Sequence, residues 1–149
     1  MPSMVKYNSF LKQQMNGGGG TAALVVDFDT DTIKVMLTTS TYVPNAATHL
    51  VKTSITNEVT GTNYTAGGAT LTSPTLTETG GVVTFDAANI TWAQSATGFS
   101  TARYAIIYKS TGVDATSALI GYYDLLSNQA NTVVPFSLIF DALGIIQWS

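Results

Sequence analysis

The chain has 149 residues, the size of one ordinary domain that can bury a core without covalent staples. Charged residues make up 10% of the sequence and the formal net charge is −3, which excludes the basic surface typical of nucleic-acid-binding proteins. The sequence has no cysteine, so disulfide bonds, thiolate metal sites and a cysteine nucleophile are excluded as well.

No segment of the sequence has the length of a membrane span. The longest apolar runs, near residues 22–26 and 137–140, are far shorter than the stretch of about 18 residues that a spanning helix needs. The N-terminus also has no apolar signal core. We therefore expect a soluble protein without a targeting signal.

Residues 1–20 are predicted to form an N-terminal arm. Ser3 can cap the start of a short amphipathic helix, Gly17 can end it, and the apolar residues between them recur at helical spacing. Such a short helix needs a surface to lie on, either its own domain or a neighbouring subunit. The predicted docking stripe is Met4, Tyr7, Phe10, Leu11 and Met15, followed by a hinge of Gly17, Gly18, Gly19 and Gly20.

After the arm the apolar period changes to two, which is typical of strands. Alternation over residues 24–28 and 33–38 around a turn at 29–31 predicts a β-hairpin. Residues 39–53, with Pro44 and the single histidine His49, are predicted to form a long loop with one irregular helical turn before the crossover.

Residues 55–71 have no helical or strand period and are predicted to form a crossover between groups of strands. Its asparagine and glycine residues suit turn positions, and we expect a positive φ at Gly67 or Gly68. We also expect Tyr64 to pack against the body of the protein.

Short strands dominate the rest of the chain. Gly80 and Gly81 predict a tight turn of a second hairpin, and the two apolar faces of residues 102–108 predict a central strand. Further strands are predicted at residues 70–72, 75–79, 82–86, 90–92, 119–125, 133–140 and 145–148. About eight or nine strands with one short helix predict an all-β fold, an antiparallel β-sandwich or a jelly-roll-like barrel, with residues 21–149 as its body.

Three aspartates form the most metal-like pattern. Asp27, Asp29 and Asp31 have the spacing of a calcium loop, but Thr32 and Thr38 stand where that loop needs glycine and a bidentate glutamate. We expect solvated turn carboxylates and no metal or other cofactor.

Catalytic patterns are weak. His49 has no nucleophile elbow to pair with, and nothing in the sequence brings two of Glu58, Glu78 and Asp86 together as a carboxylate pair. We therefore expect no enzymatic activity. Aromatic side chains can stack on sugars, so Tyr122, Tyr123 and Trp148 are a candidate carbohydrate platform, although neighbouring strand residues point to opposite faces.

A series of short motifs, in this order, resembles a group of tailed-bacteriophage virion proteins over essentially the whole chain. The motifs are Tyr-Asn-x-Phe at residues 7–10, Asp-Thr-Asp-Thr-Ile-Lys-Val at 29–35, Ile-Thr-Asn-Glu-Val at 55–59, Gly-x-x-Tyr-Thr-Ala-Gly-Gly at 61–68, Phe-Asp-Ala-x-x-Ile-Thr-Trp at 85–92, Ala-Arg-Tyr-Ala at 102–105, Leu-Ile-Gly-Tyr-Tyr-Asp at 119–124 and Phe-Asp-Ala-x-Gly-Ile at 140–145.

The resemblance implies a small all-β head decoration (cement) protein. Such a protein is made in the host cytoplasm, binds the major capsid protein on the outside of the virion and forms a homo-oligomer, a trimer or a dimer, without binding nucleic acid or membranes. It carries no catalytic residues, and the N-terminal stripe would clamp neighbouring coat subunits. A tail or baseplate component and a carbohydrate-binding module for host attachment are the alternatives.

Overall fold

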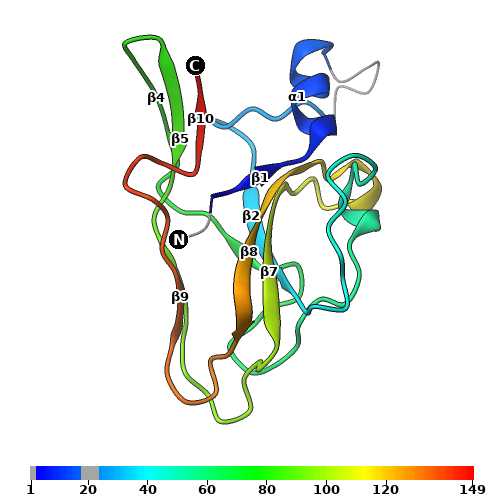
Figure 1. Ribbon diagram of the computed structural model, residues 1–149, viewed down its shortest axis with the longest axis vertical. Coiled ribbons are helices and arrows are strands. Elements are labelled where there is room, and N and C mark those ends of the chain that lie inside the picture. Colours follow the sequence, from blue (N-terminus) through cyan, green and yellow to red (C-terminus); the bar gives the residue numbers. More distant parts are fainter. Residues whose placement is uncertain (1–2, 18–23) are drawn as a thin grey trace.

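The computed structural model describes residues 3–17 and 24–149 (Figure 1). In this part of the chain the fold is mostly β, with antiparallel strands and one short α-helix, which confirms the predicted all-β class. The elements are β1 (Val5–Lys6), α1 (Asn8–Met15), β2 (Ile33–Thr38), a 3₁₀ turn (Lys52–Ser54), β3 (Ala69–Thr70), β4 (Thr75–Thr79), β5 (Val82–Asp86), β6 (Ile90–Trp92), β7 (Ala102–Lys109), a second 3₁₀ turn (Asp114–Thr116), β8 (Leu119–Gln129), β9 (Phe136–Leu138) and β10 (Ile146–Trp148).

The strands form three antiparallel sheets. The largest has the order β1-β8-β7-β2-β3, the second has the order β10-β5-β4, and β6 pairs with β9. In Figure 1 the long strands β8, β7 and β2 run through the middle of the molecule, and the β4–β5 hairpin projects from it beside β10. The described residues include no helix long and apolar enough to cross a membrane.

Strand β7 separates two apolar cores, because both of its faces are apolar. Ala105 and Ile107 lie in the main core, which fills the space between the five-stranded sheet and strands β5, β6, β9 and β10. Ile106 and Tyr108 point the other way into a second core. Strand β7 lies between β8 and β2, so the predicted central strand is confirmed.

The long loop before the crossover covers the second core. Tyr42 from this loop packs there with Tyr7, Met36 and Leu119, and Ala46 and Ile55 lie at its margin. The predicted loop over residues 39–53 is confirmed, and the helical turn expected before the crossover is the 3₁₀ turn at Lys52–Ser54.

The crossover is an ordered part of the fold. The Glu58 carboxylate accepts hydrogen bonds from Tyr64 Oη at 2.7 Å and from the Gly67 amide at 2.6 Å, while Tyr64 Oη accepts one from the Leu37 amide at 3.0 Å. Tyr64 packs against the main core. Both Gly67 (φ +85°) and Gly68 (φ +78°) have a positive φ, as predicted.

The prediction of a hairpin over residues 24–38 is wrong, because only its second half, β2, is a strand. Residues 24–28 form no strand, because the backbone N–H and C=O of Val26 bond the Gln14 side chain at 2.8 Å each and so cannot join a ladder. The Asp31 amide then bonds the Asp27 carbonyl at 2.8 Å and closes a turn. The apolar residues of the alternating pattern, Leu24, Val26 and Phe28, are nevertheless buried.

Other differences concern the ends of elements. The helix begins at Asn8, and Tyr7, not Ser3, is its cap residue, without a side-chain cap. The preceding residues are extended because they pair with β8, with Val5 opposite Tyr122. The predicted strand at 133–140 shrinks to β9, since Val133 and Val134 are exposed and Pro135 cannot donate to a ladder.

Candidate functional site

The N-terminal segment is anchored on its own domain. The Tyr7 amide donates to the Ile120 carbonyl at 3.0 Å and the Asn8 amide donates to the Ala46 carbonyl at 2.9 Å. Tyr7 is 0% and Phe10 1% exposed, and the Phe10 ring lies 6.0 Å from the ring of Phe28. In this conformation Tyr7 and Phe10 are core residues and are not available to a partner.

The predicted docking stripe therefore divides into two sets. Phe10 lies in the main core with Met4 packed against it, and Tyr7 lies in the second core. Leu11 and Met15, four residues apart on α1, are exposed, Met15 to 89%. Of the predicted hinge, Gly17 is exposed with a φ of +62°, and Gly18, Gly19 and Gly20 lie outside the described residues. Only Leu11 and Met15 face outward for a partner.

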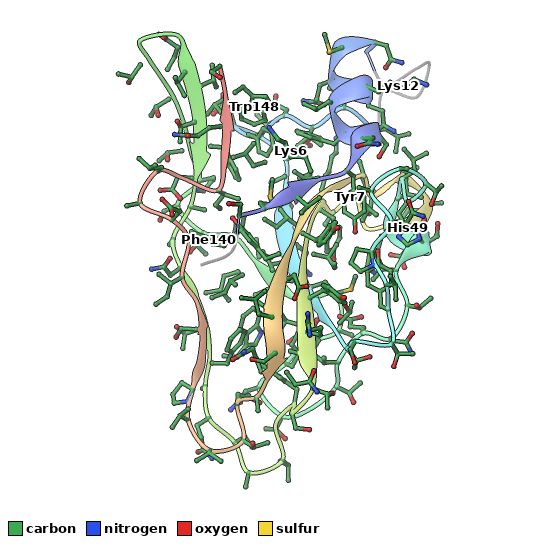
Figure 2. The ribbon with its side chains drawn as sticks, viewed as in Figure 1. Lys6, Tyr7, Lys12, His49, Phe140 and Trp148 are labelled. Atoms are coloured by element: carbon green, nitrogen blue, oxygen red, sulfur yellow. The ribbon has the colours of Figure 1, made fainter. Side chains whose placement is uncertain are left out.

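His49 ends a chain of hydrogen bonds between the long loop and the N-terminal segment (Figure 2 labels His49 and Tyr7, the two ends of this chain). Its Nδ1 lies 2.8 Å from Tyr42 Oη and accepts from the Asn45 amide at 3.3 Å, and Tyr42 Oη lies 3.1 Å from Tyr7 Oη. A ring nitrogen that already accepts an N–H is the acceptor for Tyr42 as well. The imidazole thus holds the loop over the second core, and within the described residues its hydrogen-bond partners are Tyr42 and Asn45.

Two of the three aspartate side chains, those of Asp27 and Asp31, hold a turn. Asp27 Oδ1 accepts from the Asp29 amide at 3.0 Å, and Asp31 Oδ2 lies 2.9 Å from Lys109 Nζ. Hydrogen bonding from the Thr30 side chain is the largest cause that lowers the pKa of Asp27. No group of three or more potential metal ligands occurs in the part of the chain that the structure describes.

The remaining candidate carboxylates also bond nearby groups of the fold. Glu58 holds the crossover, Glu78 accepts from the Gly81 amide at 2.7 Å, and Asp86 accepts from the Ala87 amide at 2.8 Å. Each of these side chains has a structural role in a turn or a loop.

The three aromatic residues of the candidate sugar platform do not share a surface. Tyr123 is 3% exposed in the main core, while Tyr122 lies on the opposite face of β8 against Tyr7, as expected for neighbouring strand residues. Trp148 packs 5.7 Å from the Phe28 ring, and Lys6 lies over its ring at 5.9 Å (Figure 2). The structure does not bring these rings together for stacking on a ligand.

A cavity of about 280 Å³ lies between the N-terminal strand and the C-terminal segment. Its charged lining residues are Lys6 and Asp141, and Tyr123 and Gln147 contribute polar groups. Ligand pockets usually start near 300 Å³ and are mostly apolar. The cavity is therefore a weaker candidate than the apolar surface described next.

Exposed apolar side chains are the most unusual surface feature of the molecule. The segment of residues 133–143, which includes β9, runs along one flank of the molecule (Figure 1). Its buried residues include Leu138 and Phe140, which fix it to the main core. Its exposed large apolar residues are Val133, Val134, Ile139 and Leu143, with exposed fractions from 59% to 83%. We call these four residues the flank surface.

The tyrosines provide a measurable property of this fold. Burial is the largest cause that raises the pKa of Tyr108 and Tyr123, each to about 12. Burial likewise raises the pKa of Tyr7, Tyr42, Tyr64 and Tyr122. Six of the seven tyrosines thus hold their protons more tightly in the folded chain.

This property predicts alkaline unfolding. An unfolded chain releases tyrosine protons near pH 10, whereas the folded chain keeps them, so the unfolded state binds fewer protons and the free energy of unfolding falls as the pH rises above about 10. Urea midpoints at rising pH, followed together with tyrosinate absorbance, check this: most of the absorbance change should accompany the loss of structure. Full tyrosinate absorbance near pH 10 with native circular dichroism would contradict it.

No protein-family model, curated protein or solved structure matches this chain.

Proposed function

We propose that this chain is a structural subunit that works through protein–protein contacts, as a decoration protein on the outside of a phage head. The flank surface is the observation that carries the proposal. Exposed apolar patches often mark contact sites for other proteins, and here four exposed apolar side chains come from the single segment of residues 133–143. Its placement in a virion rests on the motif resemblance in the sequence.

The chemistry of the surface supports a contact role. Only 10% of the residues are charged, well below the quarter that is typical of soluble domains, so little charge has to be desolvated when this surface is covered. A shell repeats each contact over many copies, and linked weak contacts then hold strongly. We propose the major capsid protein as the partner of the flank surface, with Leu11 and Met15 on α1 as a second contact.

The same proposal includes the finer architecture. Two layers, the five-stranded sheet and the smaller sheets that share its main core, fit a β-sandwich. Such a rigid body presents the flank surface without rearrangement, because Leu138 and Phe140 hold the segment on the core.

Quantitative mass spectrometry of purified phage particles from the source of this chain tests the proposal. A decoration protein is repeated with the symmetry of the head and should be present at hundreds of copies per particle. A count of tens or fewer would favour a tail or baseplate component, and absence from the particle would overturn the proposal.

A further inference from the structure

We propose that two copies of this chain pair through strand β4, antiparallel about a two-fold axis at Thr77. The two three-stranded sheets would then join into one sheet of six strands. The pairing goes beyond the proposed function and does not depend on it, because it concerns a different surface and a second copy of the same chain.

Strand β4 has an accessible edge along its whole length. It pairs with β5 on one side only, and all five of its residues are exposed. Other edge strands are shorter, with two or three residues, and the outer side of β10 receives Lys6 Nζ, which donates to the Gln147 carbonyl at 3.3 Å. Figure 1 shows β4 at the outer margin of the projecting hairpin. A free edge of this kind is a template for another strand.

The turn determines which backbone groups of β4 face outward. Gly80 (φ +60°) and Gly81 (φ +84°) form a two-residue turn of type I′, so Thr79 and Val82 are a hydrogen-bonded pair. Because bonded and non-bonded pairs alternate, Leu76 and Glu78 direct their N–H and C=O groups to the free side.

The neighbouring strand confirms this alternation. The Phe85 carbonyl, opposite Leu76, points away from β4 and accepts from the Ile145 amide at 2.8 Å. Leu76 and Phe85 therefore do not exchange hydrogen bonds, and the amide and carbonyl of Leu76 are free for a further strand.

One antiparallel register matches β4 with itself over its full length. This register is centred on Thr77 and places Leu76 of each copy opposite Glu78 of the other. Both residues direct their backbone groups outward, so each of these two symmetric pairs can form two backbone hydrogen bonds. The side chains then meet as threonine pairs, Thr77 with Thr77 and Thr75 with Thr79, which are favourable cross-strand pairs. A shift by two residues would place Glu78 opposite Glu78 or Leu76 opposite Leu76, with fewer paired residues.

The usual devices that protect an edge do not block β4. Its register with β5 runs from Thr75 to Thr79 without a bulge, and it has no lysine. Its one charged residue, Glu78, directs its carboxylate to the Gly81 amide of its own turn. Pro74 precedes the strand and limits the pairing to these five residues.

Single cysteines test the register, since the natural chain contains none. Thr77 would face Thr77 as a non-hydrogen-bonded pair with Cα atoms about 4.5 Å apart, within the range of a disulfide. In the same register, two copies of Thr79 are separated by four residues along the strand, roughly 13 Å. Thr77→Cys should form covalent dimers at least tenfold faster than Thr79→Cys under mild oxidation. Equal rates would overturn the proposal.

A backbone variant tests the pairing itself. Leu76→Pro removes an outward amide without breaking the β4–β5 ladder, and Leu76→Thr is its control because it keeps the amide. In sedimentation velocity over rising concentration, the wild type and Leu76→Thr should form dimers, and Leu76→Pro should shift to monomer by about tenfold in dissociation constant. The intrinsic fluorescence of Trp92 and Trp148 verifies that the fold is intact. A monomeric wild type, a trimer, or an unchanged Leu76→Pro would contradict the two-fold pairing.

Discussion

Gly68→Ala is expected to destabilise the protein by roughly 2–5 kcal/mol, the combined cost of a left-handed residue with a side chain and of overpacking. An added Cβ would collide with the Val35 carbonyl and lie 2.7 Å from Met36 Cα, and both groups belong to the backbone of the interior strand β2. Neither can move without disturbing the five-stranded sheet. The loss should be visible as a lower urea midpoint with an unchanged m-value.

Alanine substitutions at two other glycines, Gly80 and Gly67, separate the backbone strain from the overpacking. Gly80 also has a positive φ, +60°, but a Cβ there would meet nothing within 4 Å, so Gly80→Ala should cost only the conformational strain, about 1 kcal/mol. In Gly67→Ala the atom nearest to the added Cβ would be Tyr108 Oη at 3.4 Å, an ordinary contact, so this variant also lacks the collision. If Gly68→Ala costs no more than these two variants, the close approach of the crossover to β2 is wrong.

Phe10→Ala is expected to cost about 3–5 kcal/mol, the usual loss for an aromatic side chain removed from a core. The ring is 1% exposed and lies 6.2 Å from the Trp148 ring as well as near Phe28, so it joins the first helix to the last strand. Met15 on the same helix is 89% exposed, and Met15→Ala should change stability by less than about 0.5 kcal/mol.

The comparison of these two variants in urea denaturation decides how the N-terminal segment is attached. A large loss for Phe10→Ala with a small one for Met15→Ala is expected for a segment that belongs to the domain. Similar small losses for both would mean that the segment is a free arm in solution.

Strands with a clear alternation could be predicted from the sequence. Residues 33–38, 82–86 and 102–109 lie in sheets because alternating or two-faced apolar residues have one stable placement. Residues 24–28 show the same alternation but form no strand, because the side-chain amide of Gln14 bonds the backbone groups of Val26. No local pattern could show that contact, because it depends on where the helix lies.

The five residues of the predicted docking stripe do not lie on one face, for a related reason. Its spacing fits a helix, but Val5 and Lys6 pair with β8, so residues before Tyr7 follow strand geometry and those after it follow the helix. The flank surface could not be predicted from the sequence either. Val133, Val134 and Ile139 resemble strand residues in the sequence, and only the folded chain shows that they face outward.

The central claim is that the flank surface contacts the capsid. Co-sedimentation with heads that lack the protein tests it with Val133→Ser/Ile139→Ser, against a matched control, Val43→Ser/Val113→Ser, whose side chains are similarly exposed elsewhere. Loss of two aliphatic side chains that binding would bury should weaken binding by at least about tenfold, or 1.4 kcal/mol, while the control binds like the wild type. Wild-type binding by the flank variant, or equal loss in the control, would contradict the claim.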